Sequence, residues 1–212
     1  MKTKFYRIAN FPNVIGCIDG VLIGIQTPYQ DEASYVSRKG FHALNVQAIA
    51  DAEMKFINVV IRWPGSTHDS FILTNSNISN ELEQRNNGWL LGDSGYALKN
   101  WLMTPFMHPV NVQQQRYNSA HARTRNIVER SFGVLKSRFR CLDRSGGHLS
   151  YQPKKAVHII GACFSLHNFA TEKKMPVPNH DDDDNHDDEN NVAMQQPAGR
   201  AQEIRNHIAS RF

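Results

Sequence analysis

The sequence predicts a mixed α/β domain, because short β-branched runs fill its first third and helical periodicity follows later. The runs lie within residues 13–63, and Gly, Pro and Asp residues separate them. The helical periodicity is clearest over residues 119–140, where the apolar positions form one stripe. With 212 residues, of which 40% are hydrophobic, the chain is long enough for one domain with extensions and a sizeable core.

The predicted strands of the first third are separated by turn residues, which favours an antiparallel meander. They cover residues 13–19 with a continuation at 21–26, then 42–51 and 55–63. The Ser-Thr-His-Asp run at 66–69 precedes Phe71 and has the composition of a helix N-cap region. Residues 88–93 predict a fourth, shorter strand, which ends in Asp93.

Helices dominate the predicted second half of the chain. We expect residues 97–118 to be irregular, with Pro105 and Pro109 as breakers, before the long helix at 119–140. A second apolar helix, at 156–170, is expected to pack against the sheet. Residues 176–199 are rich in Pro, Asp, Asn and Gln, which predicts a disordered linker before a short helix at 200–212.

The charge is distributed unevenly along the chain, although the net charge is only +4. Residues 1–175 hold 21 Lys and Arg against 12 Asp and Glu, whereas the stretch 181–189 is acidic. Within 116–155 ten basic residues face only two acids, Glu129 and Asp143. A body this basic favours a polyanionic partner such as DNA, and a merely solvated basic face is the alternative.

Two other classes of protein are disfavoured by the sequence. No run of 18 apolar residues is present, and the N-terminus lacks the apolar stretch of a signal peptide, so we expect no membrane partner. The three cysteines, Cys17, Cys141 and Cys163, are widely spaced and contain no CxxC pair. This spacing excludes a disulfide framework and a thiolate zinc site.

Three acids are placed where the predicted strands and helix would bring them together. Asp19 and Asp93 end short apolar strands, and Glu129 lies on the long helix beside its apolar stripe. Basic residues share the helix face of Glu129, and Gly133 leaves room beside it. These bases are Arg125, Lys136 and Arg140.

Clustered carboxylates without cysteine or a suitable histidine set favour hard divalent cations such as Mg²⁺ or Mn²⁺. Two such ions can activate a nucleophile and stabilise the leaving oxygen during phosphodiester cleavage, while the basic face holds the phosphate backbone. Structural roles remain open for each acid: turn or cap chemistry for Asp19, Asp93 and Asp69, and a salt bridge to Arg125 for Glu129.

Several ordered blocks of the sequence resemble the harbinger transposase-derived nucleases, relatives of the PIF/Harbinger transposases with a DDE superfamily endonuclease domain. The blocks include IGCIDG at 15–20, DEASYVSRKGFH at 31–42, WPGSTHDS at 63–70 and WLLGDSGY at 89–96. They continue with WLMTP at 101–105, RYNSAH at 116–121, VERSFGVLKSRF at 128–139 and LHN at 166–168. The resemblance covers roughly residues 10–172.

This resemblance implies a ribonuclease H-like fold, with a mixed sheet and helices on both faces. It implies catalytic, metal-binding acids at Asp19, Asp93 and Glu129, and a further metal-facing acid at Asp69. Its domain would span 13–175, after an N-terminal remnant at 1–12. Family members have a longer N-terminal region with a helix-turn-helix-like segment, so we expect this chain to be a partial gene model or to have lost that module.

The resemblance also implies a location and a partner. We expect the nucleus, with the cytoplasm as a second location, and a separate Myb/SANT-like DNA-binding protein as partner. Arg38 and Lys39 are candidate phosphate contacts, and His68 and His121 are auxiliary candidates for which we favour structural hydrogen bonds. The predicted function is a metal-dependent DNA nuclease without transposition activity, and the alternative is a catalytically silent DNA-binding or adaptor scaffold.

Overall fold

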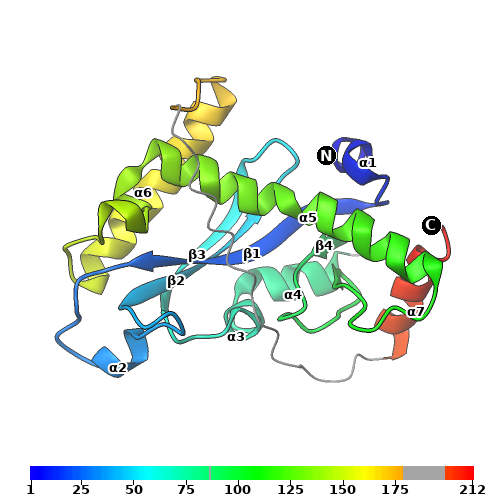
Figure 1. Cartoon of the computed structure of the whole chain (residues 1–212), viewed down its shortest axis with the longest axis horizontal. Helices are drawn as coiled ribbons and strands as arrows, with labels where there is room; N and C mark the ends of the chain where they lie inside the picture. The colour runs from blue at the N-terminus through cyan, green and yellow to red at the C-terminus, as the bar shows by residue number, and fades with distance from the viewer. Residues whose placement is uncertain (86, 179–198) are drawn as a thin grey trace.

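The computed structural model describes residues 1–85, 87–178 and 199–212 and contains a five-stranded mixed sheet (Figure 1). The strand order across the sheet is β3-β2-β1-β4-β5. The strands are β1 (Val14–Gly24), β2 (Ala43–Ala50), β3 (Phe56–Pro64), β4 (Trp89–Leu91) and β5 (Leu102–Met103). The mixed α/β class predicted from the sequence is therefore confirmed.

The first three strands form the predicted antiparallel meander, whereas β4 and β5 run parallel to β1. The parallel pairing ends where Cys17 lies opposite Leu91, but β1 continues to Gly24 beside β2. The expectation that Asp19 ends its strand is thus wrong. Asp19 lies mid-strand because Asp19 and Gly20 keep partners in β2, namely Ala48 and Gln47.

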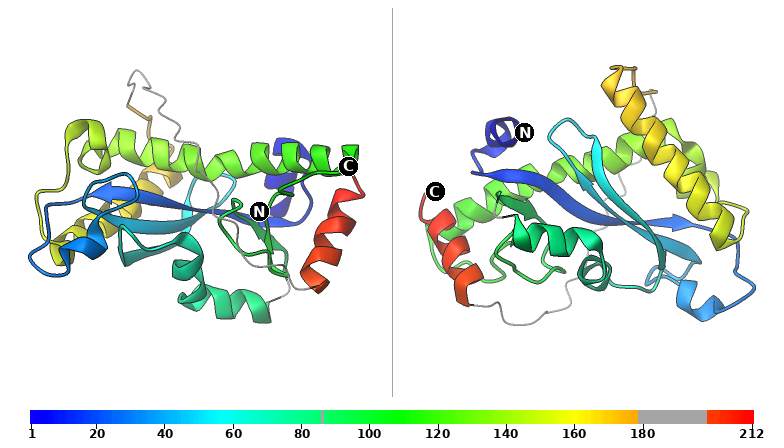
Figure 2. Two further views of the ribbon diagram at one scale, coloured as in Figure 1. Left: turned by 60° about the horizontal axis from the view of Figure 1, so that its bottom comes forward. Right: turned by 180° about the vertical axis from the view of Figure 1, so that it is seen from behind.

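Helices cover both faces of the sheet (Figure 2). On one face α5 (Val112–Arg138) crosses β1 and β2, and α6 (Pro153–Glu172) packs on β3. This layer encloses the larger core, in which Phe56 contacts Phe132 and Phe164. On the other face α3 (Asp69–Thr74) and α4 (Asn77–Gln84) cover a smaller core around Ile18 and Leu90. Successive β1 residues serve opposite cores, as the twofold period of a strand requires.

The long helix differs from its prediction at both ends. It begins at Val112, because the side chain of Asn111 accepts a hydrogen bond from the Gln114 amide and caps it. It ends at Arg138, and Arg140 follows in the 3₁₀ turn Arg140–Leu142. Arg140 therefore does not lie on the helix face that we predicted it to share with Glu129.

Several short elements are not predicted by the sequence. The segment 1–12 contains α1 (Lys2–Ala9), whose Phe5 is fully buried. α2 (Glu32–Tyr35) precedes β2, and α4 forms in a stretch that reads as polar, with Ile78 and Leu82 packed on the smaller core. These elements span only four to eight residues, which is too short for a periodic pattern to distinguish a helix from a loop.

The C-terminal helix α7 (Gly199–Ala209) packs against α5, beside the N-terminal region (Figure 1). Ile208 is buried there, and the Phe212 ring lies 5.8 Å from that of Phe11. The predicted short helix is present, while the predicted linker lies almost wholly outside the described residues. Within the described part of the chain, no helix has the length and apolarity needed to cross a membrane.

Candidate active site

Asp19 occupies the face of β1 that looks toward α5. Cys17 and Asp19 share this face because side chains two residues apart in a strand point the same way. The Oδ1 atom of Asp19 accepts a 2.8 Å hydrogen bond from the Gly20 amide, and Oδ2 accepts from Arg125 Nη1 at 3.0 Å. Asp19 is only 8% exposed, so its charge depends on these partners.

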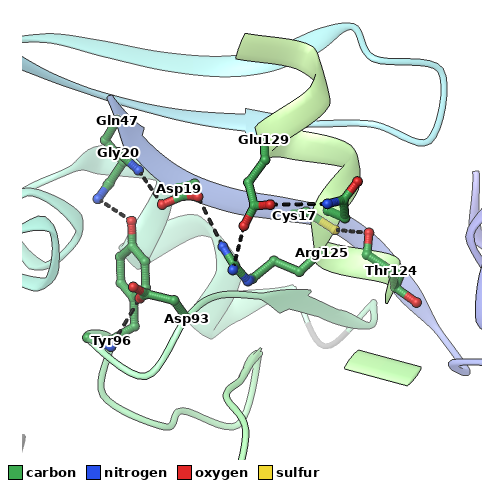
Figure 3. A network of polar contacts seen from close by, with 11 residues as sticks. Cys17, Asp19, Gly20, Gln47, Asp93, Tyr96, Thr124, Arg125 and Glu129 are labelled. Carbon is green, nitrogen blue, oxygen red and sulfur yellow. Dashed lines mark hydrogen bonds and ion pairs between the residues drawn. The ribbon is translucent and has the colours of Figure 1, made fainter. Parts of the chain in front are cut away.

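Arg125 joins Asp19 to Glu129 (Figure 3). Its Nη2 atom lies 2.5 Å from Glu129 Oε1, one helical turn away, and Asn126 donates to the other Glu129 oxygen at 3.2 Å. The side chains of Arg125 and Glu129 are 22% and 25% exposed. Glu129 therefore does pair with Arg125, but the pair is half-buried and shared with the strand rather than solvated.

Asp93 joins this group from the loop after β4. Its Oδ1 atom accepts a 3.0 Å hydrogen bond from the Gly95 amide, which fixes the turn. Burial lowers the pKa of Arg125, but the negative charges of Asp19, Glu129 and Asp93 outweigh it and raise the pKa overall. The three predicted acids are thus grouped around one permanently charged guanidinium.

Tyr96 is a member of the site that sequence reasoning missed. Its ring is buried, and its hydroxyl oxygen accepts a 2.9 Å hydrogen bond from Gln47 Nε2. Burial raises the pKa of Tyr96 well above its ordinary value, and the charges of Asp69, Asp19 and Asp93 raise it further. The phenol therefore stays protonated among the acids.

Asp69 approaches from the opposite face of the sheet, at the first turn of α3. Its Oδ1 atom accepts from Asn45 Nδ2 at 2.8 Å, and a Cβ atom at Gly20 would lie 2.6 Å from the Asp69 carboxyl carbon. Asp69 is not the N-cap, because His68 holds that position, and the His68 side chain makes no capping hydrogen bond. The cap alternative for Asp69 is therefore wrong.

Asn45 and Gln47 form a buried polar pair beneath Asp69. They lie two residues apart in β2, on the face opposite Leu44 and Val46, and Gln47 also donates to the Asp69 carbonyl at 2.8 Å. The alternation of 42–51 contains this signal, but a polar residue every second position also fits a solvated strand face. Only the packing of α3 distinguishes the two.

The chemistry of this donor set fits Mg²⁺ or Mn²⁺, because it offers carboxylate oxygens and already holds one cation, Arg125. Its spacing differs from the expectation that the acids converge on shared metal ions. Among the described residues, no three His, Cys, Asp or Glu side chains form a group that could hold a metal ion. The physical reason is that the guanidinium lies between Asp19 and Glu129.

Cys17 lies below this cluster as a buried thiol. Its thiol donates to the Thr124 carbonyl at 3.4 Å, and burial raises the pKa of Cys17 far above its usual range. A neutral thiol is a poor ligand for hard cations.

The predicted phosphate contacts on the long helix are mostly paired with acids. Arg125 binds Asp19 and Glu129, which leaves its guanidinium turned into the cluster. Arg140 lies 3.2 Å from Asp143. Burial raises the pKa of Asp143, but its hydrogen bonds from Ser145 and the smaller effects of the Arg140 and Lys136 charges lower that pKa overall. The expectation of one basic stripe beside Glu129 is therefore wrong for Arg140.

The remaining predicted residues lie away from the cluster or at its border. Arg38 and Lys39 are exposed on the turn before β2, near the Gly24 end of β1. Gly24 is five residues from Asp19 along the strand, or about 17 Å. His68 is exposed beside Asp69. His121 is buried between Phe11 and Tyr117 and hydrogen-bonds the Met103 carbonyl at 3.1 Å, so it serves the core.

Comparison with known proteins identifies the family that carries this arrangement. A family model described as DDE superfamily endonuclease matches residues 18–168, which include all four acids. The chain belongs to this family. The resemblance drawn from the sequence blocks is thereby confirmed.

Relatives of this DDE superfamily endonuclease occur in animals and plants. "Putative nuclease HARBI1" of Bos taurus is 43% identical over 179 residues, which cover 84% of this chain and 51% of the relative. The human protein of the same name is 42% identical over the same shares. "Protein ALP1-like" of Arabidopsis thaliana is 30% identical over 79% of this chain and 45% of its own.

The chain spans about half the length of the curated relatives that it matches. No solved structure matches it.

Proposed function

We propose that this chain is a divalent-metal-dependent nuclease that cleaves DNA phosphodiester bonds. The observation that carries the proposal is the grouping of Asp19, Asp93 and Glu129 around the Arg125 guanidinium, where the family match also lies. The strand order β3-β2-β1-β4-β5, with β1 antiparallel to β2 and parallel to β4, supports a ribonuclease H-like fold.

The acids would hold Mg²⁺ or Mn²⁺ through Asp19, Asp93 and Glu129, with Asp69 as a further ligand or as support. When bound, the ions would lower the pKa of a water and neutralise charge on the leaving oxygen. The chain itself orients these oxygens: the Gly20 amide fixes Asp19, the Gly95 amide fixes Asp93, and Asn126 fixes Glu129. Asn45 orients Asp69 in the same way.

DNA is the proposed substrate because the body of the chain is basic and the first matched relative carries the name "Putative nuclease HARBI1". Phosphate contacts from Lys and Arg side chains give affinity that depends on salt and not on base sequence. A Myb/SANT-like protein is the proposed partner for recognition of a particular site. The nucleus, with the cytoplasm as a second location, is the proposed compartment.

A scaffold that binds DNA without cutting it is the second candidate. The observation that favours it is the guanidinium between Asp19 and Glu129, since the described residues contain no group of three acids arranged for a metal. The two candidates differ in chemistry but not in binding, so an assay must measure both.

A plasmid-nicking assay separates the two candidates. Supercoiled DNA is incubated with the full chain and Mg²⁺, Mn²⁺ or EDTA, and binding of a labelled duplex is measured in parallel. The nuclease proposal predicts nicking with either cation and none in EDTA. Binding with no nicking under any divalent cation would reject the nuclease in favour of the scaffold.

A further inference from the structure

We propose that Arg125 is a built-in counter-cation of the acid cluster, which a divalent metal must displace before it can bind Asp19 and Glu129. The inference rests on the proposed function and adds a positioning residue to it. Arg125 would hold the site together without metal and would leave it when metal enters.

Arg125 bridges two elements, β1 and α5, and does not project into solvent. Its two terminal nitrogens are used separately, with Nη1 at 3.0 Å from Asp19 on β1 and Nη2 at 2.5 Å from Glu129 on α5. The three side chains are between 11% and 25% exposed, so water screens these charges only in part. Both carboxylates concerned are ones that the proposed function assigns to a cation.

Guanidinium and metal compete for the same two carboxylates, those of Asp19 and Glu129. A hard divalent cation bonds carboxylate oxygens directly at about 2.0–2.6 Å, and an oxygen in such a bond loses much of its strength as a hydrogen-bond acceptor. The two cations also repel each other at this range in a half-buried site. Occupation by metal therefore requires the Arg125 side chain to move out from between Asp19 and Glu129.

Charge balance explains why displacement is feasible. With Asp19, Asp93 and Glu129 ionised, one guanidinium leaves the group with a formal charge of −2. Such a group still favours additional positive charge, which a divalent ion supplies better than a single arginine. The displaced guanidinium stays tethered to α5 next to the metal, where a phosphate group of bound DNA would be its natural bidentate partner.

Mn²⁺ titration of the full chain, without DNA, tests this proposal independently of catalysis. Isothermal titration calorimetry compares the parent with Arg125→Gln, which removes the competing cation, and with Arg125→Lys, which keeps the charge but cannot bridge both acids. We expect Arg125→Gln to bind Mn²⁺ at least about tenfold more tightly than the parent, because two charge-assisted contacts no longer have to be broken. Arg125→Lys should be intermediate.

Arg85→Gln is the matched control, because Arg85 also faces a carboxylate, Glu81, but in an exposed pair. It should bind Mn²⁺ as the parent does. Melting temperature gives a second readout: without metal Arg125→Gln should melt below the parent, and saturating Mn²⁺ should raise it by more than it raises the parent.

The outcomes separate this inference from the proposed function. If the parent and Arg125→Gln bind Mn²⁺ equally while Asp19→Asn does not bind it, the metal site stands and the counter-cation role is rejected. If neither the parent nor any variant binds Mn²⁺, the metal-dependent function is rejected together with this inference.

Discussion

Asp69 packs against Gly20 on the face of β1 opposite Asp19, and this contact exists because Gly20 has no side chain. A Cβ atom at Gly20 would lie 2.6 Å from the Asp69 carboxyl carbon and from its Oδ2 atom. Neither side of this contact can move easily. Asn45 holds the Asp69 carboxylate, and the Gly20 backbone pairs with Gln47 in the neighbouring strand. The glycine thus lets an acid from the opposite face reach the edge of the cluster.

Gly20→Ala should therefore lower the free energy of unfolding by about 1–3 kcal/mol, because the added methyl group displaces the Asp69 carboxylate. Chemical denaturation measures the effect. Gly133→Ala is the matched control on α5, since nothing lies within 4 Å of its Cβ position. It should stabilise the protein by up to about 1 kcal/mol. Equal stability of the two variants would show that Asp69 adjusts freely.

His121 illustrates how a histidine in a matched sequence block serves the core instead of the site. It is 2% exposed, and burial lowers the pKa of His121 to about 4. The hydrogen bond to the Met103 carbonyl opposes this shift, and the charges of Arg125 and Arg205 add to it. The unfolded chain binds a proton at this residue below pH of about 6.5. The native state binds that proton only when the pH falls to about 4.

The contribution of His121 to the free energy of unfolding should thus be fully present above pH of about 6.5. It should be lost as the pH falls toward 4, which lowers that free energy by about 3 kcal/mol. Urea unfolding at several pH values measures the slope. His121→Gln should be less stable at pH 7 but should lose less between pH 7 and pH 4. His167, whose pKa burial also lowers, accounts for a remaining slope. An unchanged slope in the variant would show that His121 is protonated in the native protein.

At the scale of elements, α5 presents basic residues in two different settings. Arg125 turns toward the sheet, whereas Arg116, Arg123 and Arg130 recur every seven residues and are exposed. Seven residues make nearly two helical turns, so these three lie in one row along the helix. We call them the outer arginine row. The row faces solvent because the buried residues of α5 occupy another side of the helix.

If the outer arginine row contacts DNA phosphates, the double variant Arg123→Gln/Arg130→Gln should reduce the slope of log affinity against log salt by about 2. Fluorescence anisotropy between about 50 and 200 mM salt measures it. Arg140→Gln is the comparison, because the Arg140 charge is already paired with Asp143 and should change the slope less. A slope that the double variant leaves unchanged would show that the row is only solvated.

At the scale of the whole molecule, strong periodicity made most of the fold predictable. The meander and the apolar stretches of the two long helices have patterns that fit only one kind of element. β5, with two residues, and α4, with two apolar anchors, carry too little pattern to be recognised. The N-terminal extension of α5 depends on the Asn111 cap and on packing against α1. The periodicity of the apolar residues contains no sign of either.

The acids were predictable as a set, but their arrangement was not. Asp19, Asp93 and Glu129 lie at positions that strand and helix patterns bring together, and the sequence blocks single them out. The bridging position of Arg125 requires the distance between β1 and α5, which no local pattern contains. Tyr96 was missed because a tyrosine in a turn next to Gly95 carries no sign that its hydroxyl will be buried among acids.

The chain ends also contribute to the molecule as a whole. Arg205 donates to the Pro105 carbonyl at 3.1 Å, and Arg116 donates to the Phe212 carbonyl at 3.0 Å. α1 and α7 both pack on α5, and Arg205 ties α7 to the loop that follows β5. This packing holds the first half of α5 in place, and Arg125 and Glu129 lie on the next turns of the same helix.

The central claim is that the acid cluster cuts DNA with a bound metal, and Asp19→Asn tests it most directly. The substitution keeps the size of the side chain and its bond from the Gly20 amide but removes the charge that a metal ligand supplies. Asp31→Asn is the control, because Asp31 is exposed and adopts φ of 50°, which asparagine tolerates.

The measurement is the Mg²⁺-dependent rate of plasmid nicking, with the melting temperature and the DNA affinity of each variant measured beside it. We expect Asp19→Asn to lose at least about a hundredfold in rate, while it stays folded and binds DNA as well as the parent or slightly better. Asp31→Asn should nick at the parental rate. Nicking by Asp19→Asn at the parental rate would contradict the metal role of Asp19 and the account built on it.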